Sequence, residues 1–185
     1  MRFPAVLFAI LLLSGCACGY HPHHDAYRAM PEPVDHSRVH QLADKDAVIE
    51  TVNQLFISTD KKDWERVTAL FAPSVLFDMT SLTGGSPATM TPHQIVESWE
   101  KGLKPLKAVH HQSGDFIVTV NGDQADAFCY ATATHYLPTK SGKNVRTFVG
   151  SYDFHLEKRD GVWWINKFKF NLKYIDGNKD LEKDV

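Results

Sequence analysis

The second half of the chain consists of strand-like segments joined by short turns. The turns Asn121-Gly122-Asp123, Lys140-Ser141-Gly142-Lys143 and Asp160-Gly161 separate residues 107–121, 124–138, 145–159 and 162–174. Glycine, asparagine and aspartate in such positions are typical of hairpins, and connections this short join antiparallel neighbours. We therefore expect one meandering antiparallel sheet, around which the rest of the chain must fold.

The residues before this sheet read mainly as helices. Between residues 44 and 61, apolar side chains recur at helical spacing, at Val48, Ile49, Val52, Leu55 and Phe56. Asp63-Trp64 opens a second, short helix that Pro73 stops, and residues 75–79 form a short strand. Thr91-Pro92-His93-Gln94 supplies a cap, a proline at the first helical position and a glutamine at the third, which predicts the start of a third helix.

Helices followed by a run of strands predict an α+β fold, with three N-terminal helices packed on one face of a curved antiparallel sheet. We expect a single domain over residues 42–175, because a chain of 185 residues is long enough for one sizeable core and too short for two. The charged residues 176–185 are expected to fray. The net charge of −2 gives no electrostatic basis for binding nucleic acid.

The N-terminus reads as a bacterial export signal. Arg2 precedes an apolar run at residues 5–13, which is far shorter than the roughly 20 residues of a membrane-spanning helix. Leu13-Ser14-Gly15-Cys16 then resembles the lipobox of bacterial lipoproteins, which implies cleavage after residue 15 and lipidation of Cys16. We expect Cys16 to anchor the protein to the cell envelope, at the periplasmic face of the outer membrane. Residues 16–41 would form a flexible tether, and an ordinary signal peptide is the alternative.

Four short motifs follow one another along the folded region. They are Asp60-Lys61-Lys62-Asp63-Trp64, Ala69-Leu70-Phe71-Ala72-Pro73-Ser74, His110-His111 and Asp160-Gly161-Val162-Trp163. Their order, together with helices before a long sheet, resembles the SnoaL-like branch of the NTF2-like superfamily over about residues 42–175. The resemblance implies a cone with an apolar cavity at its open end. It is less specific for function, because this fold serves isomerases, dehydratases, cyclases and binding proteins alike.

Within that superfamily, scytalone dehydratase and hexachlorocyclohexane dehydrochlorinase have an aspartate at the end of the first helix and a histidine before the first long strand. The resemblance places these on Asp60 and His111, and a second pocket histidine of the dehydratase on His135. It implies a catalytic pair in which the carboxylate holds one imidazole nitrogen and leaves the other free as a general base. Strand alternation does not decide between His110 and His111, and we choose His111 for its spacing to Gly114.

Alternation along the second long strand supports an inward His135. One face carries small apolar residues and this histidine, at Ala125, Ala127, Cys129, Ala131, Ala133 and His135. Small side chains suit a concave face that helices or a ligand approach closely. Cys129 is therefore expected in the core rather than in a disulfide.

Tyr152, Trp99 and Met79 are predicted to contact a ligand. The dehydratase tyrosines that hold a water against the substrate carbonyl fall on Thr59 and Met79 here. The sequence therefore leaves the group that would stabilise an oxyanion unidentified. Tyr152 offers a hydroxyl donor if it faces inward, and an outward Tyr152 fits the sequence equally. Trp99 also fits a core position on its helix.

Motifs for other chemistries do not occur in the sequence, which has no phosphate-binding glycine loop, Cys-x-x-Cys, Gly-x-Ser-x-Gly or His-Glu-x-x-His. We expect no metal and no nucleotide cofactor. The sequence favours a cofactor-free lyase or isomerase that acts on a small apolar molecule. The alternatives are a non-catalytic binder of such a molecule and a module that holds a protein of the envelope. A homodimer through the sheet face is a further expectation.

Overall fold

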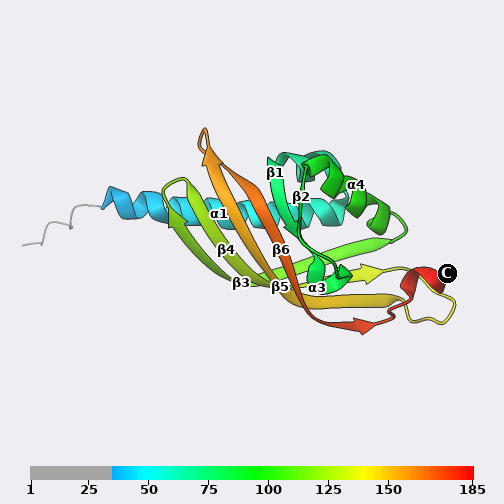
Figure 1. The fold of residues 1–185 in the computed structure, drawn as a ribbon. Coiled ribbons are helices and arrows are strands. Elements are labelled where there is room, and N and C mark those ends of the chain that lie inside the picture. The colour runs from blue at the N-terminus through cyan, green and yellow to red at the C-terminus, as the bar shows by residue number, and fades with distance from the viewer. Residues whose placement is uncertain (1–34) are drawn as a thin grey trace, which may run out of the picture. The chain divides into compact units, whose positions relative to one another are not determined.

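The computed structural model describes residues 35–185, which form helices and one six-stranded sheet (Figure 1). In chain order the elements are α1 His36–Lys61, α2 Trp64–Ala69, β1 Phe71–Asp78, α3 Thr80–Thr83, β2 Ala88–Met90, α4 Pro92–Leu103, β3 Ala108–Asn121, β4 Gln124–Tyr136, β5 Val145–Arg159, β6 Val162–Gly177 and the 3-10 turn η1 Leu181–Lys183. The predicted signal peptide, Cys16 and residues 16–34 of the predicted tether lie outside the described residues. Of the helices within residues 35–185, none is both long and apolar enough to cross a membrane.

The sheet has the strand order β2-β1-β6-β5-β4-β3. Strands β3 to β6 form the predicted antiparallel meander, with shifts of register within the β3–β4 and β5–β6 pairs. The prediction of a purely antiparallel sheet is wrong at one position, because β1 pairs with β6 in parallel. These two strands are far apart in the sequence, so no hairpin fixes their relative direction.

The helices also differ in number from the prediction. Residues 35–185 contain four α-helices rather than three, because a single turn, α3, follows β1. The Asp78 carboxylate caps this turn by accepting hydrogen bonds from the Thr80 backbone N–H at 2.9 Å and the Thr80 hydroxyl at 2.6 Å. Helix α4 begins with the predicted capping box, in which the side chains of Thr91 and Gln94 each accept a hydrogen bond from the other residue's backbone N–H.

Helix α1 begins at His36, within the segment that was predicted to be a tether. The Asp35 carboxylate accepts hydrogen bonds from the backbone N–H groups of Ser37 and Arg38, which supplies an N-cap. The first turns have no buried side chains, so they carry no apolar period that sequence reasoning can detect. The helix ends at Lys61 and is capped by Lys62 in the left-handed conformation, so Asp60 lies in its final turn.

The core lies between the helices and the inner face of the sheet. Figure 1 shows the long strands curving across α1, with α4 beside the β1 end of the sheet. Helix α1 contributes Val48, Val52, Leu55 and Phe56 to this core. The inward face of β4 is the predicted row of small residues, and Cys129 within it is fully buried and unpaired. On exposed positions of the sheet, Ile117 and Tyr130 remain open to solvent, and the predicted homodimer stays a prediction.

The C-terminal segment is packed rather than frayed, which corrects the prediction for residues 176–185. Strand β6 continues to Gly177, and Leu181 in η1 is 0% exposed. Leu181 forms a second small core with Leu106 and Val109. One buried apolar side chain, together with backbone hydrogen bonds from Asn178 to Val145 and from Lys140 to Asp184, therefore fixes a segment whose remaining residues are mostly charged.

Candidate active site

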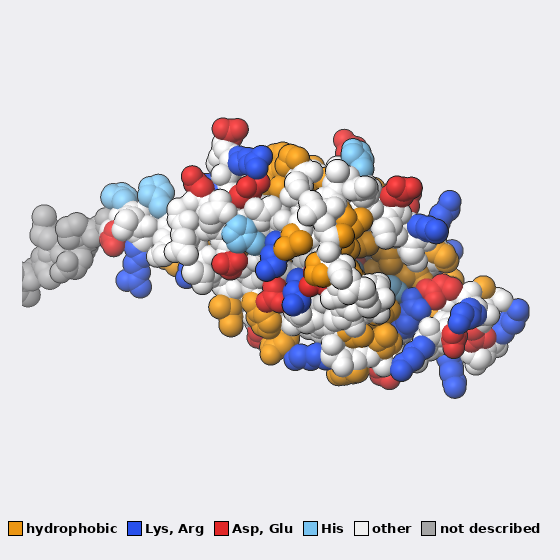
Figure 2. Space-filling model, in the orientation of Figure 1, with side chains coloured by type: hydrophobic (Ala, Val, Ile, Leu, Met, Phe, Trp, Pro, Cys, Tyr) orange, Lys and Arg blue, Asp and Glu red, His pale blue; other side chains and the backbone are white. Residues whose placement is uncertain are grey.

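A cavity of about 520 Å³ opens between α1, α4 and the inner face of the sheet. Aromatic and aliphatic side chains supply most of its wall, including Leu55, Phe56, Phe148, Phe168 and Phe170. Figure 2 shows hydrophobic side chains in a hollow between α4 and the C-terminal segment, with acidic and basic side chains at its rim. The arrangement suits a small, largely apolar molecule with a few polar groups.

His111 lies on the cavity wall and is held by Asp60 at two points. The His111 Nδ1 atom is 2.6 Å from Asp60 Oδ1, and the His111 backbone N–H donates to Asp60 Oδ2 at 2.9 Å. The imidazole also stacks on Phe56, with ring centroids 5.1 Å apart. Both side chains are largely buried, with 11% of His111 and 18% of Asp60 exposed. The last turn of α1 and the start of β3 thus fix one orientation of the ring.

This geometry determines which nitrogen of His111 is available. A carboxylate accepts hydrogen bonds, so neutral His111 carries its proton on Nδ1 and keeps a lone pair on Nε2. Within residues 35–185, His111 Nε2 forms no hydrogen bond and is not fully buried. The lone pair is therefore accessible from the cavity.

His110 does not share this position. Its side chain is 74% exposed, and its Nδ1 lies 3.8 Å from Asp60 Oδ2. It does not line the cavity. Alternation along β3 turns His110 outward where His111 turns inward, which resolves the choice that the sequence left open.

His135 lies on the same wall, on β4, and faces a different partner. Its Nδ1 is 3.2 Å from Nη2 of Arg146, and its ring packs against Phe148 with centroids 5.0 Å apart. Burial first, and then the positive charge of Arg146, lower the pKa of His135 to about 4. The ring is therefore neutral at pH 7.

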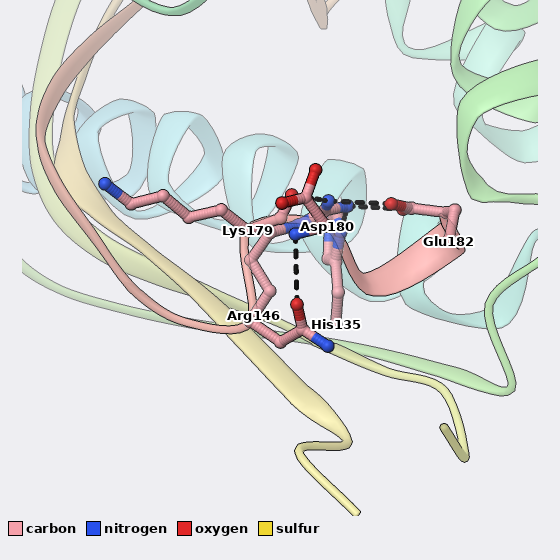
Figure 3. A network of polar contacts seen from close by, with 6 residues as sticks. His135, Arg146, Lys179, Asp180 and Glu182 are labelled. Carbon is pink, nitrogen blue, oxygen red and sulfur yellow. Dashed lines mark hydrogen bonds and ion pairs between the residues drawn. The ribbon is translucent and has the colours of Figure 1, made fainter. Parts of the chain in front are cut away.

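Arg146 and Glu182, which the sequence analysis missed, complete the polar end of the cavity. Figure 3 shows the Arg146 side chain lying between His135 and Glu182. Arg146 donates from Nη1 to Glu182 Oε2 at 2.8 Å and from Nη2 to Glu182 Oε1 at 2.5 Å. Burial would raise the pKa of Glu182, but the hydrogen bond and charge of Arg146 outweigh burial and hold it below its ordinary value. Alternation does place Arg146 on the face of Phe148, and this was the one available signal.

Tyr152 faces inward and lines the cavity, although only 6% of it is exposed. Its ring lies among Phe56, Phe168 and Phe170, with centroids 4.8 to 5.5 Å away. Burial raises the pKa of its phenol, so the hydroxyl keeps its proton. No hydrogen bond from this hydroxyl to residues 35–185 is formed, which leaves it available as a donor.

Trp99 and Met79 also line the cavity, from α4 and from the turn after β1. Trp99 packs at the same time against Phe71 and Phe168, with centroids 6.0 and 5.4 Å away, so it serves the core as well as the wall. Thr59 occupies the wall next to Asp60 and donates its hydroxyl to the Leu55 carbonyl. The structure thus brings five predicted site residues to one cavity, His111, His135, Tyr152, Trp99 and Met79, with Asp60 behind His111, and their roles stay predictions.

Among residues 35–185, the side chains around the cavity form no arrangement typical of a metal centre. Within the part of the chain that the structure describes, no group of three or more His, Cys, Asp or Glu side chains is placed to hold a metal ion. Asp60 and His111 form a pair, and Glu182 is occupied by Arg146.

An α+β domain that encloses an apolar cavity between its helices and a curved sheet defines the structural class of this protein. The model of the SnoaL-like domain family matches residues 40–169, and the chain belongs to this family. The predicted SnoaL-like domain is thereby confirmed. No match was found among curated proteins.

Solved structures share the fold at low sequence identity. The Kfla4162 protein from Kribbella flavida is 22% identical, with a TM-score of 0.72 over 77% of this chain and 98% of that one. Hexachlorocyclohexane dehydrochlorinase LinA-type3 from Novosphingobium barchaimii is 16% identical, with a TM-score of 0.65 over 77% and 94%. A Novosphingobium aromaticivorans protein assigned as a scytalone dehydratase is 15% identical, with a TM-score of 0.65 over 74% and 89%.

Proposed function

We propose that this protein is a cofactor-free lyase or isomerase in which His111, oriented by Asp60, removes a proton from carbon. One observation carries the proposal. Asp60 engages Nδ1 and the backbone N–H of His111 at 2.6 and 2.9 Å, while Nε2 is left open to an apolar cavity. A general base needs this combination of a fixed tautomer and a free lone pair.

The chemistry follows from the position of the base. His111 Nε2 would take a proton from a carbon next to an electron-withdrawing group, and Asp60 would stabilise the imidazolium that forms. Loss of a leaving group from the neighbouring carbon gives a lyase, and return of the proton to another carbon gives an isomerase. An apolar wall excludes water and strengthens the interaction between His111 and Asp60.

The substrate class is a small apolar molecule. Tyr152, Trp99 and Met79 are proposed to contact it, since they line the cavity together with aromatic residues of β5 and β6. The names of two structural neighbours, a dehydrochlorinase and a scytalone dehydratase, describe eliminations, which supports this class of reaction.

The variant Asp60→Asn tests the proposal. The asparagine retains the size of the side chain but removes the charge that stabilises the imidazolium. We expect turnover to fall about 10²- to 10⁴-fold, while the dissociation constant of a bound ligand stays within about threefold. NMR spectra of the histidine rings should show a changed tautomer for His111, whose Nδ1 loses its carboxylate partner.

Asp63→Asn is the matched control, because Asp63 lies in the next turn of the chain, caps α2 and does not line the cavity. It should leave both turnover and the His111 ring unchanged. Equal turnover in wild type and Asp60→Asn would overturn the proposed mechanism.

The second candidate function is a non-catalytic binder of a small apolar molecule. The largely aromatic cavity wall favours it, as does Met79 at a position where the dehydratase pattern has a tyrosine. A binder requires that a ligand stabilise the protein against heat without any turnover in wild type. In that case Asp60→Asn alters neither affinity nor ligand chemistry.

We further propose that Cys16 is lipidated and anchors the domain in the bacterial envelope. The lipobox-like Leu13-Ser14-Gly15-Cys16 directly after an apolar run supports this. Labelling of cells with a radioactive fatty acid should mark the wild-type protein, and Cys16→Ser should abolish the label and release the protein from the membrane fraction. A labelled Cys16→Ser variant would contradict the anchor at this residue.

A further inference from the structure

The polar end of the cavity contains a contact that determines the tautomer of His135. Arg146 Nη2 lies 3.2 Å from His135 Nδ1. A guanidinium group donates hydrogen bonds and accepts none, and it stays charged in proteins. His135 Nδ1 must therefore be the acceptor in this contact. A neutral imidazole with a lone pair on Nδ1 carries its proton on Nε2.

Glu182 fixes the guanidinium that makes this contact. It engages both terminal nitrogens of Arg146, at 2.8 and 2.5 Å, which leaves one hydrogen of Nη2 for His135. The Arg146 side chain is only 13% exposed. The Phe148 ring packs against both groups, with its centroid 5.1 Å from the guanidinium carbon of Arg146 and 5.0 Å from the centroid of the His135 ring. Packing and charge thus hold the donor in one place.

His135 and His111 are neighbours on the same face of the sheet. His111 pairs with Ala133 across β3 and β4, and His135 is the next inward residue on β4. Side chains in this diagonal relation have their backbones about 7–8 Å apart. Both rings line the cavity, so one small molecule can contact both.

We infer that Arg146 and Glu182 are positioning residues that fix His135 as a neutral hydrogen-bond donor through Nε2–H, and that the substrate is an apolar molecule with a carbonyl oxygen next to the carbon that His111 deprotonates. The inference rests on the proposed function for the role of His111. It supplies the oxyanion partner that the dehydratase-like pattern lacks at Thr59 and Met79. It also narrows the substrate class from any activated carbon acid to a carbonyl compound.

The proposed proton abstraction requires no reagent other than the substrate and the two histidines. The carbon–hydrogen bond breaks, its proton moves to His111 Nε2, and its electron pair becomes the carbon–carbon double bond of an enolate. The negative charge collects on the carbonyl oxygen, which accepts the hydrogen bond from His135 Nε2–H. The enolate then either expels a leaving group from the next carbon with its electron pair, or takes the proton back at a different carbon.

The neutral state of His135 suits this role. Burial and the nearby guanidinium keep the ring unprotonated at pH 7, with a pKa of about 4. A neutral donor stabilises an enolate by a hydrogen bond without giving up its proton. The same surroundings oppose a role as general base, because the lone pair of Nδ1 already accepts from Arg146.

The test is the tautomer of His135, measured by NMR on the full-length chain in mild detergent with ¹⁵N-labelled histidine. His135→Gln identifies the His135 signals by their loss. We expect a protonated, pyrrole-type Nε2 and an unprotonated, pyridine-type Nδ1 in wild type at pH 7. Arg146→Met removes the donor and retains an unbranched chain of similar length, so the two tautomers should then coexist. Arg146→Lys restores a donor and should return the wild-type signals.

A matched pair of probes tests the oxygen contact. 2-Acetonaphthone has a carbonyl where 2-isopropylnaphthalene has only a methyl-bearing carbon, and the two have similar shapes. A hydrogen bond that contributes a net 0.5–1.5 kcal/mol predicts that the wild type prefers the ketone by about two- to twelvefold more than His135→Phe does, because phenylalanine has a similar ring and no donor. Binding is measured by naphthalene fluorescence, and the partition of each probe into detergent is subtracted.

Three results would overturn the inference: a proton on Nδ1 of His135 in wild type, a tautomer that Arg146→Met does not change, or an equal preference for the ketone in wild type and His135→Phe. None of these measurements involves turnover. A failure of the proposed catalytic function would instead appear as unchanged turnover in Asp60→Asn, with the His135 tautomer as expected.

Discussion

His111 and His135 lie on neighbouring strands and face the same cavity, yet a carboxylate holds one ring and a guanidinium holds the other. Asp60 accepts from His111 Nδ1, whereas Arg146 donates to His135 Nδ1. The partner at Nδ1 decides what Nε2 offers to the cavity. One residue type thus presents a lone pair at His111 and a hydrogen at His135.

The two histidines also differ in how their partners reach them. Asp60 stands in the last turn of α1, a helix fixed by a large core. Arg146 stands at the beginning of β5 and depends on Glu182 from the C-terminal turn. The proposed base is therefore built on the main core of the domain, and the proposed donor on a small peripheral cluster.

The largest effect is expected at His111. His111→Gln removes the lone pair that would accept the proton, so turnover should fall about 10²- to 10⁴-fold. The measurement is the initial rate with the substrate found by screening. His93→Gln is the control, because His93 is exposed on α4 and does not line the cavity. If both variants turn over at the wild-type rate, then His111 is not the base and the contrast with His135 has no catalytic meaning.

The next largest effect is expected at Leu181, which holds the C-terminal turn that carries Glu182. Leu181→Ala removes a fully buried side chain from the cluster with Leu106 and Val109, which should cost about 2–3 kcal/mol of unfolding free energy. Without Leu181 the C-terminal turn would leave this cluster, and Glu182 in the same turn would no longer orient Arg146. Urea unfolding gives the cost.

Lys183→Ala provides the comparison for Leu181→Ala, because the Lys183 side chain lies in the same turn and is 82% exposed. It should change the unfolding free energy by less than about 0.5 kcal/mol. Equal losses in the two variants would show that the C-terminal turn does not depend on its leucine.

The sequence predicted the pair of Asp60 and His111 but not the pair of Arg146 and Glu182, and the difference has a physical reason. Asp60 and His111 sit at a helix end and a strand start that periodicity and family motifs both mark. Arg146 and Glu182 come together only because β6 runs on to Gly177 and Leu181 then finds an apolar pocket. A single leucine in a charged stretch has no period, so a long-range contact of this kind leaves no local signal.

The fold shows the same division between elements that local sequence determines and elements that tertiary contacts determine. Strands β3 to β6 follow from turn residues between alternating segments, and the inward face of β4 follows from its small residues. The parallel pairing of β1 with β6 and the three-residue β2 were not predictable, because they are set by tertiary contacts rather than by turns. The early start of α1 rests on one cap, Asp35, and the prediction missed it because the turns that follow are exposed.

The pH dependence of stability should report the burial of the His135 ring. The pKa of His135 is about 4 in the folded protein and about 6.5 for a free side chain. Between these values the unfolded chain binds more protons, so stability is complete above about pH 6.5 and falls as the pH is lowered toward 4. His135→Gln should remove about 1–2 kcal/mol of this acid sensitivity.

Urea unfolding at several pH values measures the effect. Arg146 and His111 lower this pKa and Glu182 and Asp60 raise it, so all four residues must be left intact in the variant. Identical slopes for wild type and His135→Gln between pH 4 and 6.5 would contradict a buried neutral ring at this position.

The smallest effect is expected at His110, which tests whether Asp60 discriminates between the adjacent histidines. Its ring is 74% exposed and its Nδ1 lies 3.8 Å from the Asp60 carboxylate, a distance and exposure at which an ion pair contributes little. His110→Gln should change the unfolding free energy by less than about 0.5 kcal/mol, and turnover by less than twofold. Urea unfolding and initial rates check both numbers. A loss as large as that in His111→Gln would mean that Asp60 acts through both rings.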